Sequence, residues 1–327
     1  MNSLTPLTSQ IIEVVEKAAI ACYGWIGKGD NMAADHAAVE SMRENLNLMN
    51  ITGTIVIGEG ERDEAPMLYI GEKVGLQKNS GGGIEVDIAL DPLEGTTICA
   101  NAGESSLAVI AFAQKGGFLH APDVYMEKIA VGAGLPEGVI DLDNSPQTNL
   151  ANIAKARKCA ISDLTVMILE RARHNELIAK VREAGARIRL IGDGDVAGVI
   201  ACTSQSTCVD VYMGTGGAPE GVLAAAGLRV IGGQMMGRLI FGDNQKQIER
   251  AKKMGIADLN KKYTAEEMAR GDVIFACAGV TDGYMLSGIK KCHSGKIFVN
   301  SLIMDSAAKK VINTKSEYLC TSKDYNS

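Results

Sequence analysis

The stretch Asp87–Thr96, DIALDPLEGT, joins a run of strand-forming residues to an acidic turn. Its apolar side chains alternate with acidic or small ones, which predicts a strand that ends near Asp91 and Glu94. Two carboxylates at the end of a partly buried strand are costly to desolvate together, and the stretch holds no lysine or arginine to neutralise them. The pattern therefore predicts either a bound cation or a solvated turn, because Asp, Pro and Gly are all common turn residues.

The composition is that of an ordinary globular protein. A length of 327 residues suits about two domains or one large two-lobed domain. Hydrophobic residues make up 46% and charged residues 22%, and no run approaches the ~18 apolar residues of a membrane span. The first apolar cluster, residues 11–26, contains charged side chains, so it predicts an amphipathic helix and not a signal peptide. A net charge of -6 and 4% aromatic residues argue against a nucleic-acid partner.

The cysteines and histidines show no disulfide or zinc pattern. Eight cysteines are scattered without a CxxC pair in a chain too large to need disulfides, which predicts reduced thiols and a cytoplasmic protein. The four histidines lie far apart, which disfavours a zinc site of His and Cys ligands. Positive charge for an anionic substrate would then come from a few arginines or from bound cations.

Further carboxylates stand near predicted element ends in the N-terminal half. A helix is predicted over about residues 31–50, and Asp35 falls on or beside its apolar stripe. The alternative for Asp35 alone is a favourable interaction with the helix dipole. A short strand then runs into Gly58–Glu64, where glycines flank Glu59 and permit a sharp turn, and a helix is predicted over about residues 64–74. Strands that end in acidic loops are a way to bring carboxylates from separate elements together.

From Leu164 onward the pattern alternates strands with helices. This βαβ rhythm predicts a largely parallel sheet, and such sheets bind ligands beyond the carboxyl ends of their strands. The residues at those ends are Arg171 and Arg173 after the first strand, Asp193–Asp195 after the second and Gly214–Gly221 after the third. Pro219 suits a first helical turn, from which Glu220 can point its carboxylate back across the strand ends.

A rival prediction comes from Gly192–Ala197, GDGDVA. These residues fit the dinucleotide-binding fingerprint after a strand, with Asp210 close to the expected acidic position. The residues beside the glycines are Asp193 and Asp195, whose charges would face the pyrophosphate that such a loop binds. A nicotinamide-dependent dehydrogenase is therefore the less favoured interpretation.

Longer motifs carry a family resemblance. They are IGEGERDEAPMLYIGEKVG (residues 57–75), DPLEGT (91–96), APDVYMEK (121–128), DGDV (193–196) and GGAPEG (216–221). From about Ile11 to Gly283 the chain resembles class II fructose-1,6-bisphosphatases of the GlpX type, within the superfamily of metal-dependent, lithium-sensitive sugar and inositol phosphatases. Glu94 stands where that superfamily usually has aspartate, a substitution that the class II subgroup shares.

The resemblance implies a fold and an activity. The implied fold is a two-lobed, layered α/β/α/β/α sandwich, with the active site between the lobes. We place an N-terminal α+β lobe at residues 1–155 and a C-terminal α/β lobe, with a largely parallel sheet, at residues 156–327. The implied reaction is hydrolysis of the 1-phosphate of fructose 1,6-bisphosphate to fructose 6-phosphate, a step of gluconeogenesis. Relatives are usually homodimers or homotetramers, so the same is expected here.

The resemblance also implies roles for individual residues. Asp35 and Glu59 would hold one divalent ion, and Asp91, Glu94 and Glu220 another, with Glu94 reaching both. Substrate contacts would come from three groups of residues, which are Glu94, Gly95, Thr96 and Tyr125, then Arg171, Ala172 and Arg173, and then Asp193, Gly194, Asp195 and Gly217. Similar proteins can have proline where this chain has Ala172 and lysine where it has Arg171, and both basic charges are kept here.

The chemistry of phosphate monoester hydrolysis is consistent with these roles, because it requires a positioned water and neutralised phosphoryl oxygens. Two or more Mg²⁺ or Mn²⁺ ions on carboxylate ligands meet both needs. Arg171 and Arg173 would bind the second, non-reacting phosphate as forked donors. We hypothesise that Thr96 orients the attacking water and that Asp63 takes its proton, since threonine alone is too weak a base.

Other functions stay open at this point. A sugar-phosphate sensor without turnover would not need Thr96 together with five acids. A dehydrogenase would be independent of metal. An inositol monophosphatase is disfavoured by Arg171 and Arg173, which suggest a second phosphate on the substrate. In cyanobacterial and plastid relatives this type of enzyme also accepts sedoheptulose 1,7-bisphosphate, so the resemblance leaves a bifunctional enzyme as an alternative.

Overall fold

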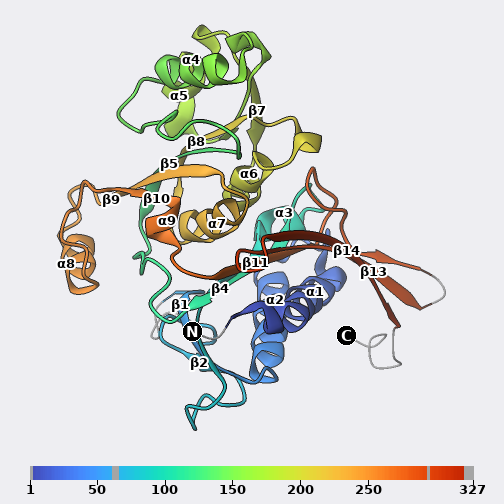
Figure 1. Cartoon of the computed structure of the whole chain (residues 1–327). Coiled ribbons are helices and arrows are strands. Elements are labelled where there is room, and N and C mark those ends of the chain that lie inside the picture. Colours follow the sequence, from blue (N-terminus) through green and yellow to red (C-terminus); the bar gives the residue numbers. More distant parts are fainter. Residues whose placement is uncertain (1–2, 61–65, 293–294, 320–327) are drawn as a thin grey trace. The chain divides into compact units, whose positions relative to one another are not determined.

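The computed structural model describes residues 3–60, 66–292 and 295–319 and divides the chain into two compact units (Figure 1). Unit 1 consists of Met1–Gly117 and Gly271–Ser327, and unit 2 consists of Phe118–Arg270. Each unit has its own sheet with helices packed on it. The expected mixed α/β class is confirmed.

The sheet of unit 1 has the strand order β12-β13-β11-β4-β3-β1-β2, and β14 pairs with β13. The pair of β1 with β3 is parallel and the other pairs are antiparallel. The strands are β1 (Ile51–Ile57), β2 (Lys73–Val74), β3 (Ile84–Glu94), β4 (Leu107–Gln114), β11 (Val273–Gly279), β12 (Lys290–Lys291), β13 (Lys296–Asp305) and β14 (Lys310–Leu319).

Two helices bury their apolar stripes against this sheet. Helix α1 (Thr8–Cys22) lies against β4, β11 and β13, and α2 (Asn31–Asn47) lies against α1 and β3. The side chain of Asp30 accepts a hydrogen bond from the N–H of Ala33 at 3.0 Å and so begins α2. The buried stripe includes Met42 and Leu46, each worth roughly 1.5–3 kcal/mol of burial. A third helix, α3 (Thr96–Ala100), follows β3 directly.

The sheet of unit 2 has the order β10-β9-β5-β8-β6-β7, with α4 and α5 on one face and α6 and α7 on the other (Figure 1). Its strands are β5 (Tyr125–Val131), β6 (Thr165–Leu169), β7 (Arg187–Ile191), β8 (Val211–Gly217), β9 (Gln234–Ile240) and β10 (Lys262–Thr264). Its helices are α4 (Pro146–Arg157), α5 (Asn175–Glu183), α6 (Asp195–Ala201), α7 (Ala218–Val230), α8 (Gln245–Lys253) and α9 (Ala265–Met268).

The prediction of a largely parallel sheet in this part of the chain needs correction. Strands β7, β6 and β8 are parallel neighbours, as the βαβ rhythm predicts. Strand β5, however, lies between β8 and β9 and is antiparallel to both, and β10 is antiparallel to β9. Because β5 precedes the βαβ run in the chain, that local rhythm does not specify its position.

The predicted lobe boundary near residue 155 also differs from the structure, which divides the chain after Gly117 and again after Arg270. Strands β11 and β13 return to the first sheet, where β11 pairs with β4 over seven positions. The last part of the chain therefore belongs with the first part. The helix predicted over residues 64–74 is wrong for its described part, since residues 66–72 are bends and turns before β2.

The helices in the described part of the chain include none with the length and apolar character needed to span a membrane.

Candidate active-site residues

The end of β3 carries several predicted site residues and is irregular. Asp91 pairs with Val109 of β4 and Glu94 pairs with Leu107, so β3 has one extra residue in this segment. A bulge of this kind bends a strand and redirects its side chains, and Pro92 has no N–H to donate to the ladder there. Glu94 is only 3% exposed, which places a carboxylate in a desolvated position at the strand end.

Gly95 and Thr96 form the turn from β3 into α3. Gly95 adopts the left-handed conformation with φ 79 and ψ 53, which a side chain would strain. Thr96 is the first residue of α3. This short helix is held to the start of α2, since Asn31 donates from its side chain to Thr97 Oγ1 at 3.1 Å. The geometry fixes the backbone that presents Thr96.

Asp35 and Glu59 come from two other elements of unit 1. Asp35 lies on α2, and its burial raises the pKa of the carboxyl group, an effect that nearby His36 opposes. Glu59 follows β1, and its N–H donates to the Leu68 carbonyl at 3.2 Å. A Cβ atom on Gly58 would overlap the same carbonyl oxygen, so this turn requires glycine.

Within residues 3–60, 66–292 and 295–319, no group of three or more His, Cys, Asp or Glu side chains is arranged to hold a metal ion. The predicted ligands Asp35, Glu59, Asp91 and Glu94 therefore do not form such a group, and the ligand set stays a prediction. In kind these donors suit a hard divalent cation, because all are carboxylate oxygens. Asp63, the predicted proton acceptor, lies outside the described residues.

In unit 2 the predicted substrate residues lie at strand ends. Arg171, after β6, pairs with Asp193, after β7, over 3.8 Å between Nη2 and Oδ1. The guanidinium of Arg173 lies 4.8 Å from the ring centre of Tyr125 on β5, and its Nε–H donates to the Thr215 carbonyl at 2.9 Å. The fold thus links both arginines to residues from other elements.

Two further predicted contacts are backbone positions. Ala172 is exposed at the start of the 3-10 helix η4 (Ala172–His174). Gly194 precedes α6 with φ 85, in the left-handed region that favours glycine.

Asp195, by contrast, lies in a buried ion pair that the sequence did not reveal. Lys128, on β5, donates from Nζ to Asp195 Oδ2 and to the carbonyl oxygen of Gly217, the latter at 2.8 Å. Lys128 is 2% exposed and Asp195 is 7% exposed. Side chains alternate along a strand, so Lys128 shares the face of Met126 and Ala130, and a lysine within that apolar set is the signal that could have identified it.

Glu220 lies in the first turn of α7 beside this pair. Burial raises the pKa of Glu220 to about 7, Asp195 adds to the rise, and Lys128 opposes it. Its Oε2 atom is buried and accepts no hydrogen bond from the described part of the chain. A buried carboxylate oxygen without a donor is suited to a cation, which is the observation that fits Glu220 to a divalent-ion ligand.

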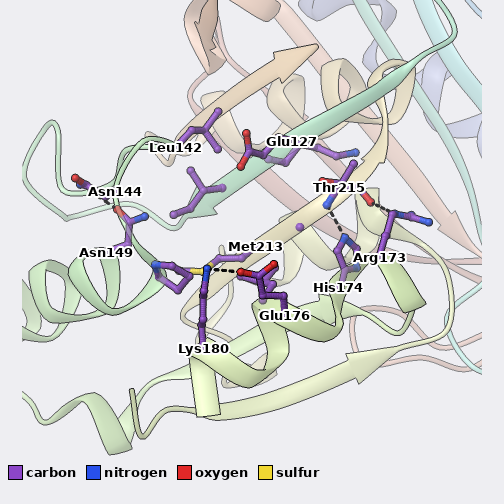
Figure 2. A pocket seen from close by; sticks show the side chains of 15 residues that line it. Glu127, Leu142, Asn144, Asn149, Arg173, His174, Glu176, Lys180, Met213 and Thr215 are labelled. Atoms are coloured by element: carbon purple, nitrogen blue, oxygen red, sulfur yellow. Dashed lines mark hydrogen bonds and ion pairs between the residues drawn. The ribbon is translucent and has the colours of Figure 1, made fainter. Parts of the chain in front are cut away.

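A pocket of about 300 Å³ lies on the α4 and α5 side of the second sheet (Figure 2). Figure 2 shows Arg173, His174 and Thr215 together at one end, and Lys180 directed toward Glu176, with 2.6 Å between their charged atoms. His174 is buried and fully hydrogen-bonded, to the Leu169 carbonyl at 2.7 Å and the Thr215 N–H at 2.8 Å. No residue of this pocket except Arg173 was predicted to contact substrate.

Comparison with known proteins decides the family. The model of the family described as bacterial fructose-1,6-bisphosphatase, glpX-encoded, matches residues 5–318. The chain belongs to this family. The match confirms the resemblance drawn from the sequence motifs and places the chain among phosphoric monoester hydrolases.

Curated relatives of this fructose-bisphosphatase family agree. A protein of Trichodesmium erythraeum (strain IMS101), named D-fructose 1,6-bisphosphatase class 2/sedoheptulose 1,7-bisphosphatase, is 44% identical over 320 residues, which cover 92% of each chain. A protein of the same name from Thermosynechococcus vestitus is 43% identical over 321 residues, again 92% of each chain. Among solved structures, an inositol monophosphatase from Anabaena (Nostoc) sp. PCC 7120 has a TM-score of 0.31 and 18% identity over 61% of this chain and 72% of that chain, a likeness too low to support an argument.

Proposed function

We propose that this chain is a metal-dependent phosphatase that converts fructose 1,6-bisphosphate to fructose 6-phosphate and phosphate by hydrolysis of the 1-phosphate. The observation that carries the proposal is the family match over residues 5–318. The desolvated carboxylate of Glu94 and the donorless buried oxygen of Glu220 support it, because both suit a cation that neutralises an anionic substrate.

The proposed cofactor is Mg²⁺ or Mn²⁺, at two or more ions per site. Asp35, Glu59, Asp91, Glu94 and Glu220 are the proposed ligands. When bound, such ions supply Lewis acidity at the phosphoryl oxygens and lower the pKa of water.

The remaining steps belong to residues of the chain. Thr96 is proposed to orient the attacking water through its hydroxyl, and Asp63 to accept the proton. Gly95 leaves room for the phosphate near the backbone, since it has no side chain. Arg171 and Arg173 are proposed to bind the distal phosphate, and the stacking of Arg173 on Tyr125 holds its fork in a defined orientation.

A second candidate is a bifunctional enzyme that also hydrolyses sedoheptulose 1,7-bisphosphate. The printed names of the relatives from Trichodesmium and Thermosynechococcus include that activity. Both substrates carry two phosphates on a ketose, so the same arginine pair serves either one.

Phosphate release tests the proposal directly. The substrates are fructose 1,6-bisphosphate, sedoheptulose 1,7-bisphosphate, glucose 6-phosphate and inositol 1-phosphate, each with EDTA, Mg²⁺ or Mn²⁺. We expect release from the bisphosphates, loss of release with EDTA and recovery with either ion. Release that EDTA leaves unchanged would refute the metal requirement, and preference for inositol 1-phosphate would refute the substrate assignment.

We also propose a cytoplasmic homodimer or homotetramer that has no nucleic-acid or membrane partner. The cysteines of the described residues are free, which supports a reducing compartment. Strand β14 pairs only with β13 among the described strands and exposes Val311 and Leu319, which supports contact with a second chain. Light scattering after size exclusion measures the mass, and a monomer at micromolar concentration would contradict the assembly.

A further inference from the structure

Lys128 is a buried cation next to three residues, and the proposed function gives each of the three a different role. Asp195 was expected to contact sugar hydroxyls, Gly217 to contact substrate and Glu220 to bind a divalent ion. Lys128 donates to the first two and counters the negative charge around the third.

The backbone of unit 2 is shaped around these side chains. A Cβ atom on Gly216 would overlap Asp195 Oδ2 and would lie 3.1 Å from Lys128 Nζ. A Cβ atom on Gly217 would overlap Glu220 Oε2. Two carboxylates from different helices therefore pack on consecutive glycines at the end of β8. Only glycine at both positions allows this packing.

The stem of Lys128 is equally confined. A Cβ atom on Gly221 of α7 would lie 3.3 Å from Lys128 Cδ, so the helix passes close to the lysine. This packing fixes where Nζ ends and hence which carboxylate it engages. Nζ binds Asp195, whereas Glu220 Oε2 accepts no hydrogen bond from the described residues.

The asymmetry has a chemical consequence. Asp195 is buried, as is the Oε2 atom of Glu220, and without Lys128 either carboxylate could ligate a divalent ion, because both offer the same kind of donor atom. With Lys128 bound to Asp195, one carboxylate is already neutralised and the other is left for the metal. The positive charge of Lys128 also opposes a second cation nearby, which limits metal affinity.

We propose that Lys128 is a positioning residue that reserves Asp195 and the Gly217 carbonyl for the sugar and leaves Glu220 for the divalent ion. The inference rests on the proposed function. Because Lys128 is buried on β5, it acts on the substrate and the ion through its neighbours and not by direct contact.

The test compares Lys128→Met with Asp195→Asn in the full-length protein. For Lys128→Met we expect Mn²⁺ to bind at least about threefold more tightly to the metal-free protein in an EPR titration, because a nearby positive charge is gone and Asp195 is released. We also expect the KM for fructose 1,6-bisphosphate to rise about tenfold or more, because the sugar contacts lose their anchor. For Asp195→Asn we expect the same rise in KM without tighter Mn²⁺ binding.

Weaker or unchanged Mn²⁺ binding by Lys128→Met would overturn the proposal, since a merely structural lysine would loosen the site when removed. An unchanged KM in both variants would overturn it as well. Should Lys128→Met not fold, Lys128→Arg keeps the charge, and we then expect wild-type Mn²⁺ affinity. A wild-type protein that binds Mn²⁺ but releases no phosphate would refute the proposed function and not the Mn²⁺ comparison.

Discussion

The hydroxyl of Thr96 is a single group whose loss tests the proposed chemistry. Thr96→Ala keeps a helix-forming residue and removes the hydroxyl that we propose orients the water, together with the γ-methyl group. We expect kcat to fall by about 10²-fold, in the range of general acid–base contributions, with little change in KM. Steady-state phosphate release measures both.

The neighbouring threonine provides a matched control. Thr97 is exposed and accepts a hydrogen bond from Asn31. Thr97→Ala should keep kcat within about threefold of wild type. Equal kcat values for Thr96→Ala and wild type would show that Thr96 does not orient the water.

The buried ring of His174 should make the stability of the protein depend on pH. Burial lowers the pKa of His174, a hydrogen bond with Leu169 opposes this, and the charges of Arg173 and Arg171 lower it further. The folded state therefore favours the neutral ring, and its Nε2 accepts the Thr215 N–H. The neutral His174 ring therefore contributes to the stability of the fold. This contribution is complete above the unfolded-state pKa of about 6.5, and it is lost as the pH falls from there through the folded-state pKa of His174.

His174→Gln removes this titration. We expect the thermal midpoint of wild type to exceed that of His174→Gln by more at a pH of about 7.5 than at a pH of about 5.5, since the wild-type advantage is lost by protonation. His120 is exposed, so His120→Gln should keep the wild-type pH dependence. If the difference in thermal midpoint between wild type and His174→Gln grew as the pH fell, the pKa of His174 would be raised in the folded state and not lowered.

At the scale of elements, a buried carboxylate joins α1 to the β13–β14 pair. Glu16 is 2% exposed and accepts hydrogen bonds from Ser301 Oγ at 2.6 Å, Ser316 Oγ at 2.8 Å and Tyr318 Oη at 2.6 Å. Hydrogen bonds to a charged group are worth more than neutral ones, and removal of the Glu16 carboxylate takes this acceptor from the buried Ser301 hydroxyl and the half-buried Ser316 and Tyr318 hydroxyls. The network therefore fixes β14 on the first unit.

We expect Glu16→Ala to destabilise the protein by about 3 kcal/mol and Glu16→Gln by about 1–2 kcal/mol, because the amide still accepts some of the hydrogen bonds. Urea unfolding followed by tryptophan fluorescence measures this, since the single tryptophan, Trp25, lies in unit 1. Glu13 is exposed on the same helix, and Glu13→Gln should stay within about 0.5 kcal/mol of wild type. Equal stability of Glu16→Ala and Glu13→Gln would rule out the network.

Some elements were predictable because their signals are local. The apolar stripe of α2 and the strand–helix alternation from Leu164 follow from periodicity, and both are confirmed. The place of β5 was not predictable, since it depends on pairing with β8 and β9, which follow much later in the chain. The ion pair of Lys128 with Asp195 was missed for the same reason, because its two residues are 67 positions apart in the chain.

At the scale of the whole molecule, the sequence motifs predict the residue types of the candidate site but not how the chain brings these residues together. Motifs predicted the acidic strand end at Glu94 and the basic residues after β6 as parts of the site, and these roles stay predictions, whereas the match over residues 5–318 confirms the family. The division into units was not foreseen, since nothing in the local sequence marks that β11 and β13 return to the first sheet. Long-range strand pairing, which sets such divisions, leaves little trace in local composition.

The roles proposed for Thr96 and Arg173 lead to a last prediction. The proposed water-orienting residue Thr96 belongs to unit 1, whereas Arg173, proposed to bind the distal phosphate, belongs to unit 2. Changes at Arg173 should therefore affect binding of bisphosphates more than turnover. For Arg173→Met we expect the KM for fructose 1,6-bisphosphate to rise by about 10- to 100-fold, the value of a charge-assisted contact, with kcat reduced much less.

The same substitution should leave slow hydrolysis of a sugar monophosphate unchanged, because that substrate has no second phosphate to bind. Arg182 is exposed on α5, and Arg182→Met supplies a control that removes a positive charge from the same unit. Parallel assays on the bisphosphate and the monophosphate give the selectivity ratio. A ratio that falls for Arg173→Met and not for Arg182→Met assigns the distal phosphate to Arg173, whereas equal losses on both substrates would mean that Arg173 acts only through the fold.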